Sequence, residues 1–338
     1  MTTLDNKKSI ILTGITPSGT PHIGNYIGAI KPAIELAKNE NYQARYFIAD
    51  YHSLVKLWDP KLRKKYTYEI AASWLALGLN PKSTVFYRQS DVPEIMELNW
   101  ILTSMAAKGL LNRAHAYKAQ ADENISIENK DPDYGITMGL FNYPILMAAD
   151  IILFDTKLVP VGKDQIQHVE IARDIANRFN HVYQTKCLVE PTAVMNEKTK
   201  TIPGLDGRKM SKSYGNTIPI FENGKKLRKL IMKIKTNSQL PKEPKDSSIC
   251  NIFSLYENFA TDAEILDLKS RYLSGIGWGE AKQILFEKIE QELSPAREIY
   301  NRLIENPTEI ETALKIGAKQ ARTIASAKLQ EIRTVIGI

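Results

Sequence analysis

Cysteine is scarce in this sequence. Only Cys187 and Cys250 occur in 338 residues, and they lie 63 positions apart. Two such residues cannot form a disulfide framework, and no CxxC pair is present to begin a zinc site. This cysteine content is typical of a protein from a reducing compartment.

Long apolar runs are also missing. No window approaches the ~18 uninterrupted apolar residues of a membrane-spanning helix, and the short run at Ile10–Leu12 is too small for a signal peptide. Internal repeats and low-complexity tracts are absent. With 43% apolar residues the chain can build a sizeable core. We therefore expect a soluble, cytoplasmic protein of two domains with no membrane partner.

The charge of the chain is basic but evenly spread. The formal net charge is +7, with +4 in residues 1–220 and +3 in residues 221–338. The concentrated run is 225–235, which holds six basic residues and no acid. Its apolar positions fall at helical spacing, so it predicts an amphipathic helix with a solvated face. A helix that faces nucleic-acid phosphates is the alternative.

The first part of the chain alternates strand-like and helical patterns. Asp59 and Pro60 are a good N-cap and first residue for a helix that ends near Gly78, and a second helix is expected to open at Asp164. This alternation favours a parallel sheet with helices on both faces. The expected strands are Ile10–Gly14, Ala44–Asp50, Thr84–Arg88 and Ile151–Asp155.

From about residue 221 the strand-like runs disappear, and helical segments broken by Gly and Pro remain. We predict a Rossmann-like α/β domain over residues 1–220 and an α-helical domain over 221–338. The segment Glu309–Val335 keeps a helical period and can pack back onto the first domain.

Two loops carry the residues best suited to bind a nucleotide. Residues 12–25 leave an expected strand, cross a Gly/Pro/Ser loop and enter a helix near Ile23, with His22 and Asn25 as possible donors to phosphate. Residues 204–215 place Lys209 and Lys212 between glycines, where a mobile loop can close over a polyphosphate. Each loop also has an ordinary structural interpretation when taken alone.

Together the two loops resemble the HIGH and KMSKS signatures of class I aminoacyl-tRNA synthetases. They read His-Ile-Gly-Asn at 22–25 and Lys-Met-Ser-Lys-Ser at 209–213. Residues 142–150 and 159–168 resemble the specificity region of the tryptophanyl-tRNA synthetases, and residues 25–29, 48–52 and 89–93 are also similar to that family. The resemblance covers essentially the whole chain, densely up to residue 216.

The resemblance implies a role for each matching residue. The catalytic residues would be His22, Asn25, Lys209 and Lys212. The ATP-binding residues would be Gly14, His22, Gly24, Asn25, Asp164, Lys209, Met210, Ser211 and Lys212. The tryptophan-binding residues would be His52, Tyr143, Met147, Asp150 and Gln165, with Asp150 accepting the indole N–H and Asp50 near the same pocket.

The resemblance also implies the reaction and its partners. Tryptophan would attack ATP to give tryptophanyl-adenylate and pyrophosphate, with Mg²⁺ carried by the ATP and no protein metal site. The tryptophanyl group would then pass to the 3′ end of tRNA(Trp). A homodimer is implied, in which the helical domain reads the anticodon.

Some residues depart from the family pattern or carry no functional role in this interpretation. Thr16 stands where many members have Gln, so it is not assigned to the site. Lys118 is either a phosphate contact or a solvated lysine. We expect His115, His168 and His181 to be structural, and a helix cap is the structural alternative for Asp150.

Three other interpretations are considered. A short tyrosyl-tRNA synthetase shares the fold, but a tyrosine pocket needs polar groups directed at a phenol, which Met-Ala-Ala-Asp at 147–150 does not supply. A small-molecule adenylyltransferase would leave the helical domain unexplained. A non-catalytic RNA-binding relative is disfavoured because both motifs are intact.

Overall fold

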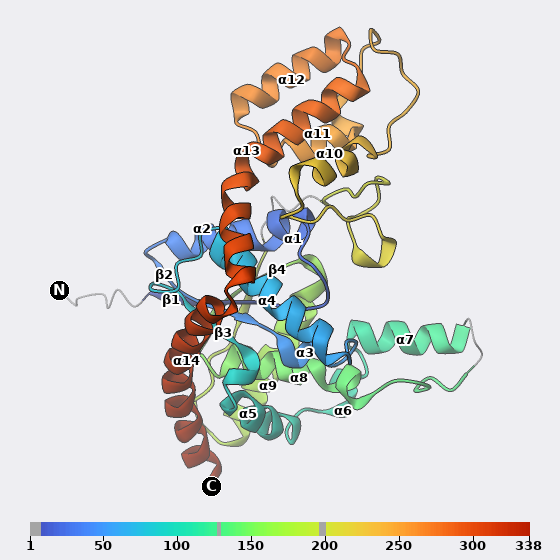
Figure 1. Ribbon diagram of the computed structural model, residues 1–338. Helices are drawn as coiled ribbons and strands as arrows, with labels where there is room; N and C mark the ends of the chain where they lie inside the picture. Colours follow the sequence, from blue (N-terminus) through green and yellow to red (C-terminus); the bar gives the residue numbers. More distant parts are fainter. Residues whose placement is uncertain (1–7, 127–129, 196–200) are drawn as a thin grey trace, which may run out of the picture.

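The computed structural model describes residues 8–126, 130–195 and 201–338, and a parallel sheet of five strands lies at its centre (Figure 1). The strand order is β3-β2-β1-β4-β5. Strands on the two sides of β1 are reached in opposite directions, and ligands of open α/β sheets bind at such a switch point. The strands are β1 (Ser9–Ile15), β2 (Tyr42–Ile48), β3 (Val85–Arg88), β4 (Leu158–Val161) and β5 (Thr192–Met195).

The sheet has a core on each face, because successive side chains of a strand point to opposite sides. In β1, Ile11 joins one buried cluster and Leu12 joins the other. Phe86 and Tyr87 of β3 divide in the same way. The helices before residue 201 are α1 (Ile23–Asn25), α2 (Lys31–Lys38), α3 (Asp50–Ser53), α4 (Pro60–Ala76), α5 (Glu94–Thr103), α6 (Lys108–Leu111), α7 (His115–Ser126), α8 (Met138–Ile152) and α9 (Ile166–Val182).

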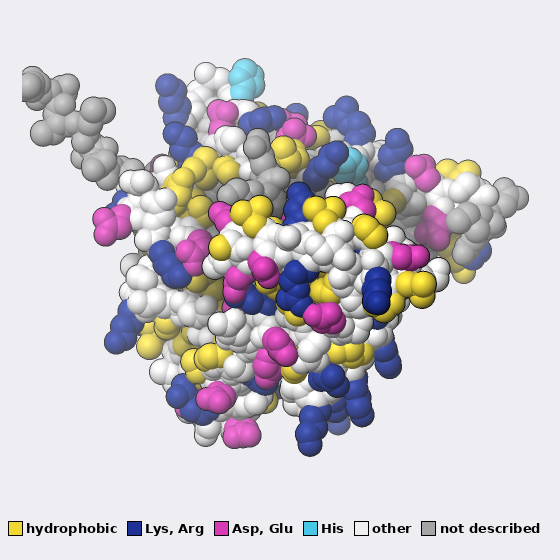
Figure 2. Space-filling view, turned by 90° about the horizontal axis from the view of Figure 1, so that it is seen from above, with side chains coloured by type: hydrophobic (Ala, Val, Ile, Leu, Met, Phe, Trp, Pro, Cys, Tyr) yellow, Lys and Arg dark blue, Asp and Glu magenta, His cyan; other side chains and the backbone are white. Residues whose placement is uncertain are grey.

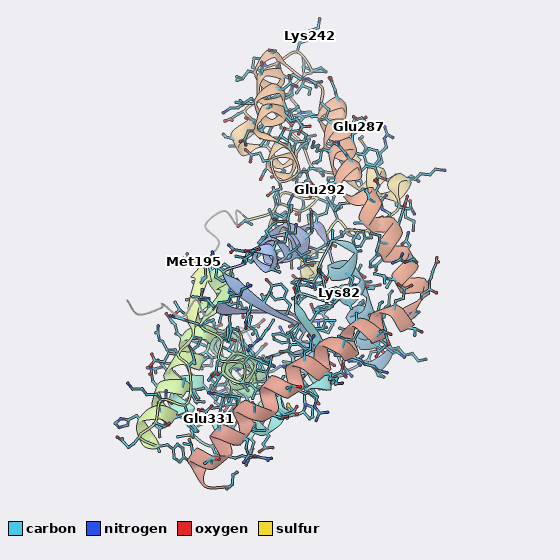
Figure 3. All side chains as sticks on the ribbon, turned by 90° about the vertical axis from the view of Figure 1, so that its left-hand side faces the viewer. Lys82, Met195, Lys242, Glu287, Glu292 and Glu331 are labelled. Carbon is cyan, nitrogen blue, oxygen red and sulfur yellow. The ribbon has the colours of Figure 1, made fainter. Side chains whose placement is uncertain are left out.

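The part of the chain after residue 220 is helical. Its first part, up to the middle of the long helix Trp278–Glu305, extends away from the sheet, whereas the last helix, Pro307–Ile336, runs beside the sheet (Figure 1). Figure 3 labels Lys242 near one end of the molecule and Glu331 near the other. The apolar cluster on one face of the sheet continues without a break into these helices. They are α10 (Gly224–Met232), α11 (Asn251–Tyr256), α12 (Asp262–Ser274), α13 (Trp278–Glu305) and α14 (Pro307–Ile336). A domain boundary at residue 220 stays a prediction.

The long helix α13 links the helical region to the first motif segment. Its Glu292 accepts hydrogen bonds from the Tyr26 hydroxyl and from Lys31, whose Nζ lies 2.9 Å from Glu292 Oε1 (Figure 3). Both partners belong to the helical run that starts at Ile23 and includes a π-helical segment, Tyr26–Ile30. The helical segment that follows the first motif is therefore in direct contact with the helical region.

The last helix, α14, packs on β3 at the edge of the sheet. A Cβ atom at Gly317 would lie 1.8 Å from the Phe86 carbonyl oxygen, so only glycine allows this approach. Covering an edge strand with a helix prevents it from pairing with another chain.

Several expected elements are confirmed and some are wrong. The first three strands and the helix capped by Asp59 are found, and Asp59 Oδ1 accepts from the Lys61 amide at 2.8 Å. The expected strand Ile151–Asp155 is wrong, because it covers the end of buried helix α8 and the turn that follows. The helix expected from Asp164 starts two residues later, after a 3₁₀ turn over Lys163–Gln165.

The surface shows no large field of one sign on the face seen in Figure 2, where basic and acidic side chains are interspersed. The run 225–235 mostly forms α10, with Leu227 and Ile231 buried and the lysines facing outward. Among the described residues, no helix is both long and apolar enough to cross a lipid bilayer.

Candidate active site

The candidate site lies where four neighbouring strands end. The loop that begins at Thr16 follows β1, Asp50 follows β2, Gln89 follows β3, and Lys163 follows β4. Because these strands are parallel and adjacent, their carboxyl ends meet at one edge of the sheet. The fold therefore brings together most of the segments that the sequence singled out.

The first motif is a capped helix start. His22 is the N-cap of α1, where its Nδ1 accepts from the Asn25 amide at 3.3 Å and its own amide donates to Asn25 Oδ1 at 3.1 Å. This reciprocal capping box fixes both side chains. His22 and Asn25, both predicted to contact ATP, therefore support each other.

The chemical state of His22 follows from its surroundings. Burial, with a further contribution from Lys212, lowers the pKa of His22 to about 4, so the ring is neutral near pH 7. Because Nδ1 accepts from a backbone amide, the ring proton is on Nε2. His22 can thus offer a neutral N–H donor to a phosphate oxygen.

The second motif lies in a loop that folds against the first. Lys212 Nζ donates to the Gly19 carbonyl at 2.9 Å, and partial burial lowers the pKa of Lys212. Gly19 has φ +144°, and a Cβ there would lie 2.9 Å from Lys212 Cδ. Glycine is needed at this position for both reasons. The loop in this structure is closed onto the segment that follows β1.

A second link between the motifs is made by Met210. Its side chain is buried, and its sulfur accepts from the Gly24 amide at 3.3 Å. Nearby, the Ile23 amide donates to the Ile218 carbonyl at 2.8 Å. Met210 therefore acts by packing and by a sulfur contact to α1, while its backbone amide bonds Ile202.

Asp150 is the centre of the most buried polar network. It is completely inaccessible to solvent, and its Oδ2 lies 2.9 Å from His52 Nε2. Gln89 Nε2 lies 2.8 Å and 2.9 Å from the two carboxylate oxygens. Gln89 is oriented in turn, because its Oε1 accepts from the Tyr51 amide at 3.1 Å.

The surroundings of Asp150 determine what it can bind. Burial raises its pKa, while the hydrogen bonds from His52 and Gln89 oppose that shift. Asp150 lies inside α8, so the alternative that it caps a helix starting near Ile151 is wrong. A carboxylate has about four acceptor positions, so a further donor can still be bound.

Tyr143, Met147 and Asp150 share one face of α8, since they lie at positions i, i+4 and i+7. Tyr143 and Met147 are half-buried beside the fully buried Asp150. The helix thus presents a hydroxyl, a thioether and a carboxylate along a single line. The sequence pattern placed these residues in one segment, and the helix aligns them.

His168 was expected to be structural, and the structure places it in contact with two predicted site residues. Its Nε2 lies 2.7 Å from the Tyr143 hydroxyl and its Nδ1 lies 2.8 Å from Gln165 Oε1. Burial lowers its pKa to about 4. Gln165 Nε2 donates to Asp164, so its Oε1 must accept from His168 Nδ1–H. Tyr143 therefore donates to His168 Nε2 and leaves its oxygen lone pairs available.

Other predicted residues have simpler environments. Lys209 and Asp164 are exposed, and Ser211 Oγ lies 2.8 Å from Ser213 Oγ. Gly14 faces the Phe47 ring, which a Cβ would approach to 2.6 Å. Thr16, Lys118, His115 and His181 are exposed. No contact in the structure gives Thr16 or Lys118 a role.

Three residues near the site were not assigned by sequence reasoning. Gln89 binds Asp150, Ser90 binds Asp50 through its amide at 2.9 Å, and Asn216 holds the second motif loop. Gln89 and Ser90 lay within a segment already noted as similar to the family. Their position after a strand, as polar residues in a run 89–91, was the available signal.

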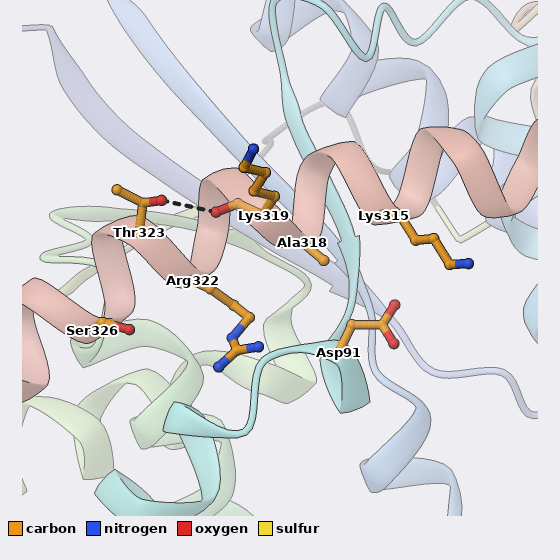
Figure 4. Close-up of a pocket in the computed structure, with 7 residues that line it drawn as sticks. All are labelled: Asp91, Lys315, Ala318, Lys319, Arg322, Thr323 and Ser326. Atoms are coloured by element: carbon orange, nitrogen blue, oxygen red, sulfur yellow. Dashed lines mark hydrogen bonds between the residues drawn. The ribbon is translucent and has the colours of Figure 1, made fainter.

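A cavity of about 510 Å³ lies away from this site, between α14 and the turn at Asp91 (Figure 4). Arg322, which lines this cavity, pairs with Glu94 at 3.0 Å, and in the groove beside it Arg333 pairs with Glu97 at 2.6 Å. These pairs join α14 to α5, so the groove is a seam between packed helices. In the described part of the chain, no group of three or more acidic, His or Cys side chains could hold a metal.

A parallel sheet carrying these two motif segments at its carboxyl edge defines a class I synthetase catalytic fold. Residues 4–294 match the family of class I tRNA synthetases (W and Y). The chain belongs to this family. Curated relatives include the tryptophan–tRNA ligases of Bordetella pertussis and Xanthomonas axonopodis pv. citri, which are 52% and 53% identical over 97% of this chain and 73% and 76% of theirs.

Solved structures give the same result. The tryptophanyl-tRNA synthetase of Campylobacter jejuni in complex with ADP and tryptophan has a TM-score of 0.88 and 45% identity, covering 97% of this chain and all of that one. The Mycoplasma pneumoniae tryptophanyl-tRNA synthetase has a TM-score of 0.81 and 28% identity, with 98% of each chain covered. A tyrosyl-tRNA synthetase from Archaeoglobus fulgidus, at 18% identity and a TM-score of 0.64, shares the fold.

Proposed function

We propose that this aminoacyl-tRNA synthetase is a tryptophan–tRNA ligase, which activates tryptophan with ATP and transfers it to tRNA(Trp). One observation carries the proposal. The two motif segments meet at Gly19–Lys212 and Gly24–Met210, at the same edge of the sheet as the buried polar network around Asp150. Curated relatives that cover nearly the whole chain support the same activity.

The nucleotide half of the site aligns the reacting groups and stabilises the charge that develops during the reaction. Tryptophan's carboxylate attacks the α-phosphorus of ATP and pyrophosphate leaves, so negative charge builds on the phosphate oxygens. Lys209 and Lys212 neutralise the leaving group, and the neutral His22 donates its Nε2–H. Mg²⁺ arrives on the ATP oxygens as part of that substrate. No covalent bond to the protein is needed, because alignment and electrostatics lower the barrier.

The amino-acid half of the site selects tryptophan. Tyr143 donates its proton to His168, so its oxygen can accept from the substrate ammonium. Met147 packs on the ring, and Asp150 accepts the indole N–H. His52 and Gln89 hold the carboxylate in one orientation, since both bind it directly.

Two alternatives are weaker on specific grounds. A tyrosine-specific enzyme would need donors and acceptors for a phenolic hydroxyl, and the likeness to a tyrosyl enzyme extends to the fold alone. A small-molecule adenylyltransferase would not need a helical region whose α13 bonds, through Glu292, the helical segment that follows the first motif.

The remaining parts of the proposal concern partners. The helical region binds the anticodon of tRNA(Trp), and exposed lysines of α10 contact its phosphates. The enzyme is a homodimer in the cytoplasm, where its free cysteines, Cys187 and Cys250, stay reduced. Reversing Lys225, Lys226 and Lys229 to Glu is expected to weaken tRNA charging and leave adenylate formation unchanged.

The proposal is tested by ATP–pyrophosphate exchange with tryptophan, with tyrosine and with no amino acid, followed by charging of tRNA(Trp). Exchange that depends on tryptophan, together with charging, is the expected result. Exchange with tyrosine alone would favour the tyrosyl enzyme. Tryptophan-dependent exchange without charging would favour the adenylyltransferase.

A further inference from the structure

Within the loop 204–216, which contains the second motif, one buried side chain, that of Asn216, bonds several distant positions. Asn216 is only 3% exposed although it follows four exposed residues. Its Oδ1 accepts from the Ser211 amide at 2.8 Å. Its Nδ2 donates to Asp206 Oδ1 at 2.7 Å and to the Lys209 carbonyl at 3.1 Å. The side-chain amide of Asn216 thus bonds the loop at Asp206, before the lysines, and at two backbone groups between Lys209 and Lys212.

The fit around Asn216 is close. A Cβ at Gly204 would lie 2.4 Å from Asn216 Cγ, and the Leu205 amide donates to the Asn216 carbonyl at 3.0 Å. The hydrogen bond from Asn216 is also the main reason that the pKa of Asp206 lies below its ordinary range. Both the backbone and the side chain of Asn216 therefore bond the beginning of the loop to its end.

The bonds from Asn216 fix the backbone between the two active lysines, on either side of Met210. They bind the carbonyl of Lys209 and the amide of Ser211, the residue that precedes Lys212. Lys212 then reaches the Gly19 carbonyl at 2.9 Å. Ser211 and Lys212 have few other local anchors, since their side chains point to Ser213 and to the loop after β1.

We infer that Asn216, paired with Asp206, is a positioning residue that sets Lys209 and Lys212 for adenylate formation. The inference rests on the proposed function for its reaction and on the loop geometry for its mechanism. A misplacement of about 1 Å at such a site can cost about 10²-fold in rate. We therefore expect Asn216→Ala to lower the rate of adenylate formation by about that factor, with tryptophan affinity unchanged.

A charge-swap series separates positioning from general stability. Asn216→Asp places a second carboxylate against Asp206, so the two repel unless they share a proton. At pH 8 the ATP–pyrophosphate exchange rate of Asn216→Asp should be lower than that of Asn216→Ala. As the pH falls toward 6 the rate of Asn216→Asp should rise, whereas the rate of wild type should not. Asp206→Asn in the same chain removes the repulsion and should restore most of the loss. The bond to the Lys209 carbonyl stays missing, so rescue is partial.

The matched control is Asn180→Ala. Asn180 also brackets a loop, with its Nδ2 2.8 Å from the Leu188 carbonyl and its Oδ1 3.0 Å from the Leu188 amide. It lies at the end of α9, outside the site. This variant should lose a similar amount of stability in thermal unfolding and keep wild-type exchange.

The experiment combines single-turnover adenylate formation, tryptophan titration and trypsin cleavage after Arg208, Lys209 and Lys212. The expected result is slow adenylate formation and fast cleavage in both Asn216 variants, with rescue by Asp206→Asn. Wild-type rates in a folded Asn216→Ala, or an equal loss in Asn180→Ala, would overturn the inference. If Asn216→Ala does not fold, the Asn216→Asp series decides. The cleavage assay tests the positioning of the loop independently of the reaction. If wild type failed to use tryptophan, that result would refute the proposed function and leave the inference about the loop to be decided by cleavage.

Discussion

The two halves of the active site are built in different ways. Around Asp150 the polar groups are buried side chains that bond one another, as with His52 and Gln89. Around Lys212 the groups lie on a surface loop that is held through its backbone and Asn216. A buried network couples specificity to stability, whereas an exposed loop can change its activity without changing the fold.

The largest expected effect is on the loop side. Lys212→Ala should lower adenylate formation by about 10²–10³-fold, because the ammonium stabilises charge that develops on the leaving group. Tryptophan affinity and the melting temperature should stay near wild type. Single-turnover kinetics and thermal unfolding check this, and a normal rate would make Lys212 a bystander.

The next effect is on the amino-acid half of the site, where His168 makes the free energy of unfolding depend on pH. The pKa of His168 is about 4 in the fold and about 6.5 in an unfolded chain, so the unfolded state binds the proton more readily between these values. Stability is therefore present above pH 6.5 and is lost as the pH falls toward 4, by up to about 3 kcal/mol from this histidine.

In His168→Gln the free energy of unfolding should fall less with decreasing pH than in wild type. His181→Gln is the control and should behave like wild type, because His181 is exposed. The check is the free energy of unfolding by urea between pH 7 and pH 4.5 for the three proteins. Identical pH slopes for wild type and His168→Gln would contradict the buried, neutral state of His168.

A third effect concerns Asp150. Asp150→Ala should cost about 1–3 kcal/mol of tryptophan binding through the unpaired indole N–H. It should also lower the melting temperature, since Gln89 and His52 lose their buried partner. Exchange assays should show a narrower preference for tryptophan over tyrosine. Unaltered selectivity in the folded variant would remove Asp150 from the specificity site.

The smallest expected effect is at His22. His22→Asn keeps a good N-cap for α1 and removes the Nε2–H donor. ATP-dependent exchange should fall about tenfold, which corresponds to about 1.4 kcal/mol, and tryptophan affinity should not change. Titration of ATP and tryptophan separately checks this, and equal losses for both substrates would indicate a folding role instead.

The sequence was most informative where residues act through local pattern. The helix start near Ile23 and the helix cap at Asp59 depend on neighbours within three positions. The run Ile151–Asp155 misled because a short apolar segment at the end of a buried helix has the same composition as a strand. β5, at Thr192–Met195, is a largely exposed edge strand of four residues, which is too short to show an alternating pattern.

The missed site residues share a different cause. Gln89 and Asp150 are 61 positions apart, and His168 reaches Tyr143 from another helix. Such pairs depend on which strand ends are neighbours, and no local pattern records that. Asn216 lay just beyond the five-letter motif, and its role is visible only when the loop is folded.

One measurement tests the division between the two halves most directly. It is tryptophan binding at equilibrium beside single-turnover adenylate formation, for wild type, Lys212→Ala and Asp150→Ala. The account predicts that Lys212→Ala binds tryptophan normally and reacts slowly, while Asp150→Ala binds tryptophan weakly. If Lys212→Ala lost tryptophan affinity as strongly as Asp150→Ala, the separation of selection from activation would be contradicted.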